Sequence, residues 1–232
     1  QLGAWEAALV ASGLPVAGLD ADPPKPRVVP AAPLSAAIPG EAELVDVWLT
    51  ERLPVWRVRE ALEASMPAAH RLVELHDVWL GSPALPGQVT ASVYRATLAP
   101  GTVTPDTLRS AVARLLAAGT LPRERSKGTG VVAYDLRPFI EALEVGGAMG
   151  EDGATAVLRM TLRHDPERGI GRPEEVLAAL RDELGGPLEV RALVRERLVL
   201  APPTPPAPPP PKRRPSGGGR AQPTASASRP RK

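Results

Sequence analysis

Five charged residues in the second half of the sequence form the best local candidate for chemistry: Arg123, Arg125, Lys127, Asp135 and Arg137. Lys127 lies in a Ser-Lys-Gly-Thr-Gly turn that enters a predicted strand. Such a turn can approach a phosphate with its main-chain amides while Arg and Lys neutralise the charge. Asp135 and Arg137 are two residues apart and share a face of that strand. The alternative is a solvated hairpin with a weak Asp135–Arg137 pair.

No catalytic or metal-binding residue is predicted from the other polar side chains. His70 and His76 share a face of one predicted strand, and a rise of ~3.3 Å per residue separates them by roughly 20 Å, too far to share a metal ion. His164 lies in a predicted surface loop, and Glu41 and Glu43 lie at a strand start, where solvated acids are common. The glycine spacing matches no Walker or dinucleotide fingerprint, which disfavours a nucleotide site.

The composition separates a body from a tail. The chain has 232 residues and a net charge of +2, and residues 201–232 hold eleven of its 29 prolines. Seven of the 28 Lys and Arg residues lie in this tail, which has no acid, so residues 1–200 carry 21 basic and 26 acidic side chains. A mildly acidic body weighs against a basic nucleic-acid binder as a description of the whole protein.

Two classes of protein are disfavoured by residues that the chain lacks. The sequence has no cysteine, so a cysteine-held iron–sulfur cluster, a thiolate zinc site and a disulfide framework are excluded, and we expect no cofactor. No apolar run approaches the ~20 residues that span a bilayer, and no signal peptide is visible, so we expect no membrane association and a cytoplasmic location.

The tail is predicted to be disordered. Residues 202–211 favour an extended polyproline II conformation, because nine of these ten positions are proline or alanine and none can build a core. Lys212, Arg213 and Arg214 follow and could contact RNA or another polyanion in a salt-sensitive way. The alternative is a solubilising tail without a specific partner.

The elements that would position these residues form an α+β pattern. In the second half, strands are predicted over residues 88–98, 131–140, 155–163 and 189–200, with a bulge near Val93 and Tyr94. A helix capped by Thr104 follows the first strand, and a helix beginning at Pro173 precedes the last, while Gly146 and Gly147 are predicted to form a loop. This order is the βαββαβ, ferredoxin-like arrangement.

The first half repeats that order without its opening strand. It has helical stripes near residues 2–9 and 55–62, an irregular strand over 27–37, and strands over 43–50 and 70–80. We therefore expect two tandem ferredoxin-like units, residues 1–82 and 88–200, followed by the tail at 201–232. Since the missing strand would be central in the sheet, we infer that the natural chain continues before Gln1. Trp48 and Trp79, both on predicted strands, are expected to fill the core or a sheet face.

Four segments of the chain carry a resemblance to a known family. They are the segments at residues 11–16, 41–47, 134–140 and 171–177. They resemble the radical-SAM-associated domain of bacteria, a domain of unknown function that occurs alone or behind a radical-SAM enzyme. The resemblance covers most of residues 4–200, and the Asp-Leu-Arg-Pro run is its most specific part. Two family features are absent, a Ser-His-Leu-Asp-like stretch before the first helix and a Gly-Phe-Asn-Pro-like segment after it.

Three functions are compatible with these observations. The leading hypothesis is a non-catalytic accessory module that works with a radical-SAM enzyme, as the resemblance implies, and that positions an RNA or ribosomal substrate. The second is an enzyme whose site lies around Asp135 and Arg137. The third is a protein-interaction domain that uses the vacant sheet edge of the first half.

Overall fold

The protein is a mixed α+β structure with antiparallel sheets. The computed structural model describes residues 2–79, 81–127, 130–150 and 153–202. Its helices are α1 (Leu2–Ala11), α2 (Val55–Ser65), α3 (Leu85–Gln88), α4 (Pro105–Ala117), α5 (Pro173–Leu184) and the 3-10 turn η1 (Arg137–Phe139). Its strands are β1 (Val28–Pro30), β2 (Val45–Val47), β3 (Val89–Leu98), β4 (Pro122–Lys127), β5 (Gly130–Asp135), β6 (Ile140–Gly150), β7 (Gly153–Asp165), β8 (Gly169–Ile170) and β9 (Val190–Leu200).

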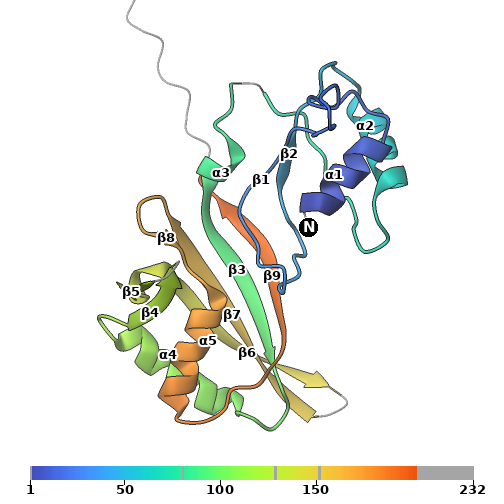
Figure 1. Cartoon of the computed structure of the whole chain (residues 1–232). Coiled ribbons are helices and arrows are strands. Elements are labelled where there is room, and N and C mark those ends of the chain that lie inside the picture. Colours follow the sequence, from blue (N-terminus) through green and yellow to red (C-terminus); the bar gives the residue numbers. More distant parts are fainter. Residues whose placement is uncertain (1, 80, 128–129, 151–152, 203–232) are drawn as a thin grey trace, which may run out of the picture. The chain divides into compact units, whose positions relative to one another are not determined.

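The main sheet has the strand order β6-β7-β3-β9, and β8 pairs with the end of β7. Every neighbouring pair is antiparallel. Helices α4 and α5 lie side by side on one face of this sheet (Figure 1). From residue 89 to residue 200 the elements run β3, α4, β6, β7, α5, β9. The β4–β5 hairpin is inserted after α4, and the short strand β8 follows β7.

An aliphatic core fills the space between the two helices and the sheet. Alternation along β7 places Ala156, Leu158, Met160 and Leu162 inward, and all four are buried, as the period-two pattern predicts. A register shift between β3 and β9 does lie at Val93 and Tyr94, where a bulge is predicted, but the extra residue is Glu196 of β9, and β3 keeps a regular register with β7. The predicted N-cap of α4 is also present, because Thr104 Oγ1 accepts a hydrogen bond from Thr107 N at 3.2 Å. Helix α5 ends at Gly185, which is in the left-handed conformation with φ 64°.

One predicted strand of the second half is wrong. Residues 131–140 do not form a single sheet strand, because β5 ends at Asp135 and η1 separates it from β6. β5 pairs with β4 in a separate hairpin, and β6 takes the place next to β7. Gly146 and Gly147, predicted as a loop, lie inside β6 opposite Val157 and Ala156. Two adjacent glycines are typical of a turn, but here they lie in a strand that is exposed at both positions.

The first half contains a smaller core of its own. β1 and β2 pair antiparallel, and α1 and α2 pack beside them around Leu9, Leu14, Val16 and Leu62. The predicted strand over residues 70–80 is wrong, because residues 70–79 have no regular secondary structure. Leu72 and Leu75 nevertheless pack against this core, so their apolar alternation reflects a docked extended segment rather than a strand.

The segment between β1 and β2 closes one edge of the main sheet. Gly40 bridges to Arg195 of β9, with Arg195 N donating to Pro39 O at 2.9 Å and Glu41 N donating to Arg195 O at 2.9 Å. These bonds satisfy main-chain groups that an edge strand would otherwise leave open.

Candidate functional site

Asp135 and Arg137 hold main-chain groups together. Asp135 Oδ1 accepts hydrogen bonds from Leu121 N at 2.7 Å and from Arg137 N at 2.9 Å. The Arg137 guanidinium donates from Nε to Leu116 O at 3.3 Å and from Nη1 to Ile140 O at 3.1 Å. The two side chains therefore tie the end of α4 to the junction of β5 and β6. This architectural role accounts for both residues without invoking catalysis.

The predicted basic residues of the β4–β5 hairpin face helix α5. Arg123 Nη1 donates to Asp182 Oδ2 at 2.6 Å, and the Arg125 guanidinium lies 5.2 Å from the ring centroid of Tyr134. The side chain of Lys127 lies outside the described residues, as do residues 128 and 129 of the turn. The structure thus brings Arg123 and Arg125 to one face of the hairpin, where Asp182 of α5 already pairs with Arg123.

A pocket of about 490 Å³ lies at this contact. Its wall includes Tyr134, whose hydroxyl donates to Glu175 Oε2. Burial, followed by that hydrogen bond, raises the pKa of the Tyr134 phenol above its usual range, so the phenol stays neutral. The rest of the lining comes from Pro122, Arg123, Glu124, Ala133 and Ala178. Two carboxylates beside one paired guanidinium make this a poor phosphate site.

The face of the main sheet opposite α4 and α5 carries an arginine cluster. Arg95 and Arg159 stand directly opposite each other on β3 and β7. Glu196 joins them, because its carboxylate accepts from Arg159 Nε at 2.8 Å and Nη2 at 3.2 Å and lies 3.2 Å from Arg95 Nε. The Arg159 hydrogen bond holds the pKa of Glu196 below its usual value, although burial opposes it, and the charges of Arg95 and Arg197 add to the lowering. Three arginines therefore surround one carboxylate.

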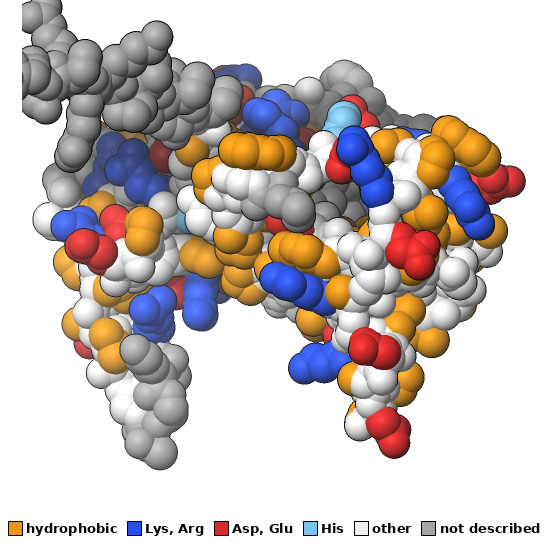
Figure 2. Space-filling view, turned by 90° about the horizontal axis from the view of Figure 1, so that it is seen from above, with side chains coloured by type: hydrophobic (Ala, Val, Ile, Leu, Met, Phe, Trp, Pro, Cys, Tyr) orange, Lys and Arg blue, Asp and Glu red, His pale blue; other side chains and the backbone are white. Residues whose placement is uncertain are grey.

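Acidic residues at the rim balance this cluster. Arg163 Nε lies 3.1 Å from Glu141 Oε1, Arg159 Nη1 lies 3.9 Å from Glu144 Oε2, and Arg95 pairs with Glu41. The surface seen in Figure 2 likewise intersperses basic, acidic and hydrophobic side chains instead of presenting one continuous basic area. We call Arg95, Arg159, Glu196 and Arg197 the arginine cluster.

A buried guanidinium joins the two halves of the sequence. Arg195 is 0% exposed, and it donates to both carboxylate oxygens of Glu43, to Pro33 O at 2.8 Å and to Ala32 O at 3.2 Å. Burial lowers the Arg195 pKa, but the hydrogen bond and charge of Glu43 outweigh it and raise the pKa above its ordinary value. Glu43 is therefore a structural residue.

A hydroxyl–imidazole pair lies near this guanidinium. Ser92 Oγ is 2.8 Å from His164 Nε2. Burial, together with the charge of Arg195, lowers the pKa of His164 to about 4. The spacing matches a nucleophile and its base. Ser92, however, is 0% exposed, so no substrate reaches its hydroxyl and the pair belongs to the interior.

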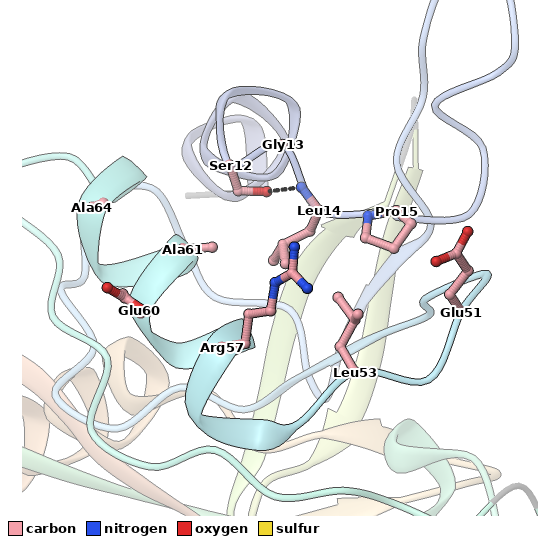
Figure 3. A pocket seen from close by; sticks show the side chains of 10 residues that line it. All are labelled: Ser12, Gly13, Leu14, Pro15, Glu51, Leu53, Arg57, Glu60, Ala61 and Ala64. Carbon is pink, nitrogen blue, oxygen red and sulfur yellow. Dashed lines mark hydrogen bonds between the residues drawn. The ribbon is translucent and has the colours of Figure 1, made fainter.

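A second pocket, of about 560 Å³, lies between the end of α1 and helix α2 (Figure 3). Its wall includes the turn in which Leu14 N donates to Ser12 Oγ at 3.2 Å, and the side chain of Arg57 extends toward Leu14. The carboxylates of Glu51 and Glu60 also line it. This pocket lies at the segment 11–16 that carries part of the sequence resemblance.

The remaining predicted residues do not converge on a site. His70 and His76 lie in the irregular segment, and His76 pairs with Glu74 at 3.1 Å. Lys212, Arg213 and Arg214 lie outside the described residues. In the part of the chain that the structure covers, no group of three or more His, Asp or Glu side chains is placed to hold a metal ion. None of the described helices has the length and apolar character needed to cross a bilayer.

A model of the bacterial family DUF2344, described as an uncharacterized protein conserved in bacteria, matches residues 11–173. The chain belongs to this family. The DUF2344 match includes the pocket turn at Ser12, the hairpin with Arg123 and Arg125, and two members of the arginine cluster, Arg95 and Arg159. No curated protein matches the chain.

Sequence reasoning missed the arginine cluster and the Arg195–Glu43 pair. The alternation along β7 places Arg159 on the face opposite the core, but its partners lie on β3 and β9, and strand register is needed to find them. Glu196 and Arg197 lie on the same face as Arg95 because of a bulge in β9, whereas the sequence predicts a bulge only at Val93 and Tyr94 of β3.

Proposed function

We propose that this protein is a non-catalytic, cytoplasmic accessory module that works with a radical-SAM enzyme and binds RNA, free or within the ribosome, through the arginine cluster. The association with a radical-SAM enzyme rests on the sequence resemblance. The RNA part rests on the cluster and on the basic tail. We also propose that residues 89–200 form a ferredoxin-like unit with an inserted hairpin, which the strand order β6-β7-β3-β9 and the two helices on one face support.

The observation that carries the proposal is the convergence of three arginines on Glu196. Arg159 and Arg95 both pair with this carboxylate and the charge of Arg197 acts on it, while the additional acids that pair with Arg95 and Arg159, Glu41 and Glu144, lie at the rim. A phosphate oxygen offers a guanidinium the same bidentate geometry as a carboxylate, and can therefore replace Glu196 as the partner of Arg159. The aliphatic stems of the arginines stay on the sheet while the charged ends face the ligand.

RNA binding by the full-length protein tests the proposal, measured by fluorescence anisotropy with a labelled single-stranded RNA over a range of salt concentrations. Arg159→Gln is expected to weaken binding by about tenfold and to reduce the salt slope by about 0.7, the loss of one phosphate contact. Glu196→Gln is expected to tighten binding by about two- to fivefold, because it removes the competing carboxylate.

A matched control separates the cluster from general charge. Arg109→Gln removes an exposed arginine of α4, which pairs with Asp106 in its own helix on the opposite side of the sheet. This variant should bind RNA like the unmodified protein. Equal losses in Arg109→Gln and Arg159→Gln, or weaker binding in Glu196→Gln, would contradict a role for the cluster. A pull-down of the full-length protein, with and without nuclease, tests the radical-SAM partner separately.

A further inference from the structure

Hydrogen bonds at the two ends of β2 show which of its residues face β1. Just before β2, Ala31 N donates to Leu44 O at 2.9 Å, and just after it Trp48 N donates to Arg27 O at 3.3 Å. Hydrogen-bonded pairs alternate with non-bonded pairs along an antiparallel ladder. The odd-numbered residues of β2 therefore direct their N–H and C=O groups away from β1, toward the opposite edge of the strand.

This opposite edge continues beyond β2. Trp48 O accepts from Ala17 N at 2.8 Å and Thr50 N donates to Pro15 O at 2.7 Å, so the two neighbours of Leu49 face the side of β1 and Leu49 itself faces away. Within the described part of the chain, no strand pairs with this edge and no hydrogen bond reaches its main chain. We call its three residues the β2 edge: Val45, Val47 and Leu49.

A second stretch beside the same core also lacks main-chain partners. Residues 71–78 form no main-chain hydrogen bond with any described residue, although two of their leucines pack on the core that β2 also covers. Val73 and Val78 of this stretch, and Trp79 after it, are more than half exposed. Main-chain groups of packed segments are normally paired. The small core of the first half is therefore short of a strand among the described residues.

The β2 edge also lacks the features that protect exposed strand edges. Folded proteins guard such edges with proline, with charged side chains or with a covering segment. The nitrogen of Pro30 points to the outer edge of β1, and residues 39–41 cover the outer edge of β9. The β2 edge instead presents three apolar residues at alternate positions, without proline or charge.

We infer that the β2 edge accepts a β-strand of a partner polypeptide. An added strand supplies the alternating N–H and C=O groups that this edge can pair with, which a nucleic acid does not. Its side chains on the side of α1 and α2 (Figure 1) would be apolar, because Val47 and Leu49 pack on that core. Arg27 and Asp46, at the ladder itself, carry one charge of each sign. Charge therefore does not select the partner, and binding should change little with salt concentration.

A synthetic peptide tests the inference with the full-length protein. The β2 edge spans ~13 Å at ~3.3 Å per residue, so a peptide of about seven residues covers it. The probe alternates valine with threonine and has one lysine at each end for solubility. Saturable binding is expected, followed by anisotropy of the labelled peptide. In the complex, the amide protons of Val45, Val47 and Leu49 should exchange with solvent more slowly than in the free protein.

Variants on both partners locate the contact. Val45→Pro removes an N–H of the β2 edge and should lower the affinity more than about tenfold. Val28→Pro is the matched control, because it makes the same change on β1 at an N–H that points away from β2, and it should bind like the unmodified protein. Two further peptides carry N-methyl groups on alternate residues. Since alternate amides face opposite edges of a strand, at least one of these peptides should bind more than about tenfold more weakly.

Three results would each overturn the inference. The first is the absence of saturable binding. The second is equal affinity of Val45→Pro and Val28→Pro, with far-UV circular dichroism showing that both are folded. The third, which decides the matter even if Val45→Pro does not fold, is that both N-methylated peptides bind as tightly as the parent peptide. None of these results bears on RNA binding by the arginine cluster, which shares no residue with the β2 edge.

Discussion

Replacing Glu43 by alanine is expected to destabilise the protein more than any other loss of a single charge considered above. The Arg195 guanidinium is 0% exposed and takes both carboxylate oxygens of Glu43 as acceptors. Removing one partner of a buried pair leaves the other charge uncompensated, which typically costs 3–5 kcal/mol. Two carbonyl acceptors, Ala32 O and Pro33 O, remain for Arg195, so we expect the lower end, about 3 kcal/mol.

Urea denaturation followed by circular dichroism measures this loss. With an m-value of about 2 kcal/mol/M, a loss of about 3 kcal/mol lowers the midpoint by about 1.5 M. Since domains typically have a total stability of about 5–15 kcal/mol, a loss of about 3 kcal/mol removes about a fifth to three fifths of it.

The matched control is Glu41→Ala. Glu41 lies two residues before Glu43 in the sequence, and its exposed carboxylate pairs with Arg95. Exposed pairs contribute about 0–1 kcal/mol, so this variant should melt close to the unmodified protein. The double variant Glu43→Leu with Arg195→Met should recover most of the loss, because it removes both charges and keeps the volume. Equal midpoints for Glu43→Ala and Glu41→Ala would refute the reasoning.

Three further predictions concern the core, the interior imidazole and the predicted site. Gly171→Ala should cost about 1–3 kcal/mol, because the new methyl would lie 3.0 Å from Phe139 Cβ, whereas Gly119→Ala has open space and should cost little; equal thermal midpoints would contradict this. His164 is held neutral, with its pKa lowered to about 4, so its contribution is complete above pH 6.5 and is lost as the pH falls from 6.5 toward 4, by about 3 kcal/mol in total. His164→Gln should flatten the stability profile in that window, and an unchanged slope would argue against the assignment. Asp135→Ala should destabilise by about 2 kcal/mol through two unsatisfied amides, and Asp135→Asn by less, because it retains an acceptor; denaturant midpoints in the reverse order would count against the capping role.

The strands and helices of the second half were largely predictable because local rules and tertiary packing agree there. Alternation in β7 and the caps of α4 and α5 follow from residues that are neighbours in sequence. The error at residues 131–140 has a specific cause. Apolar residues stand on both sides of Asp-Leu-Arg-Pro and favour one continuous strand. Asp135 and Arg137, however, bind main-chain groups there and turn the chain.

The candidate sites were less predictable because they depend on register. Whether Arg95 meets Arg159, and whether Glu196 lies between them, is decided by a pairing of strands that are about 60 to 100 residues apart and by a bulge in one of them. The exposure of Trp79 was mispredicted for a related reason, since its segment has the apolar alternation of a strand but no neighbour to pair with among the described residues.

The bridge between Gly40 and Arg195 also bears on how the chain is made. Its two halves are separated by about 150 residues, which a ribosome adding 5–20 residues per second supplies in about 8–30 s. During that interval the stretch around Gly40 has emerged from the ribosome before its partner strand β9 exists. Its main-chain amides and carbonyls can then pair with any extended polypeptide nearby. The stretch around Gly40, which covers the outer edge of β9 in the folded protein, is thus free to pair wrongly during synthesis, and a chaperone that binds it would act where this topology needs it.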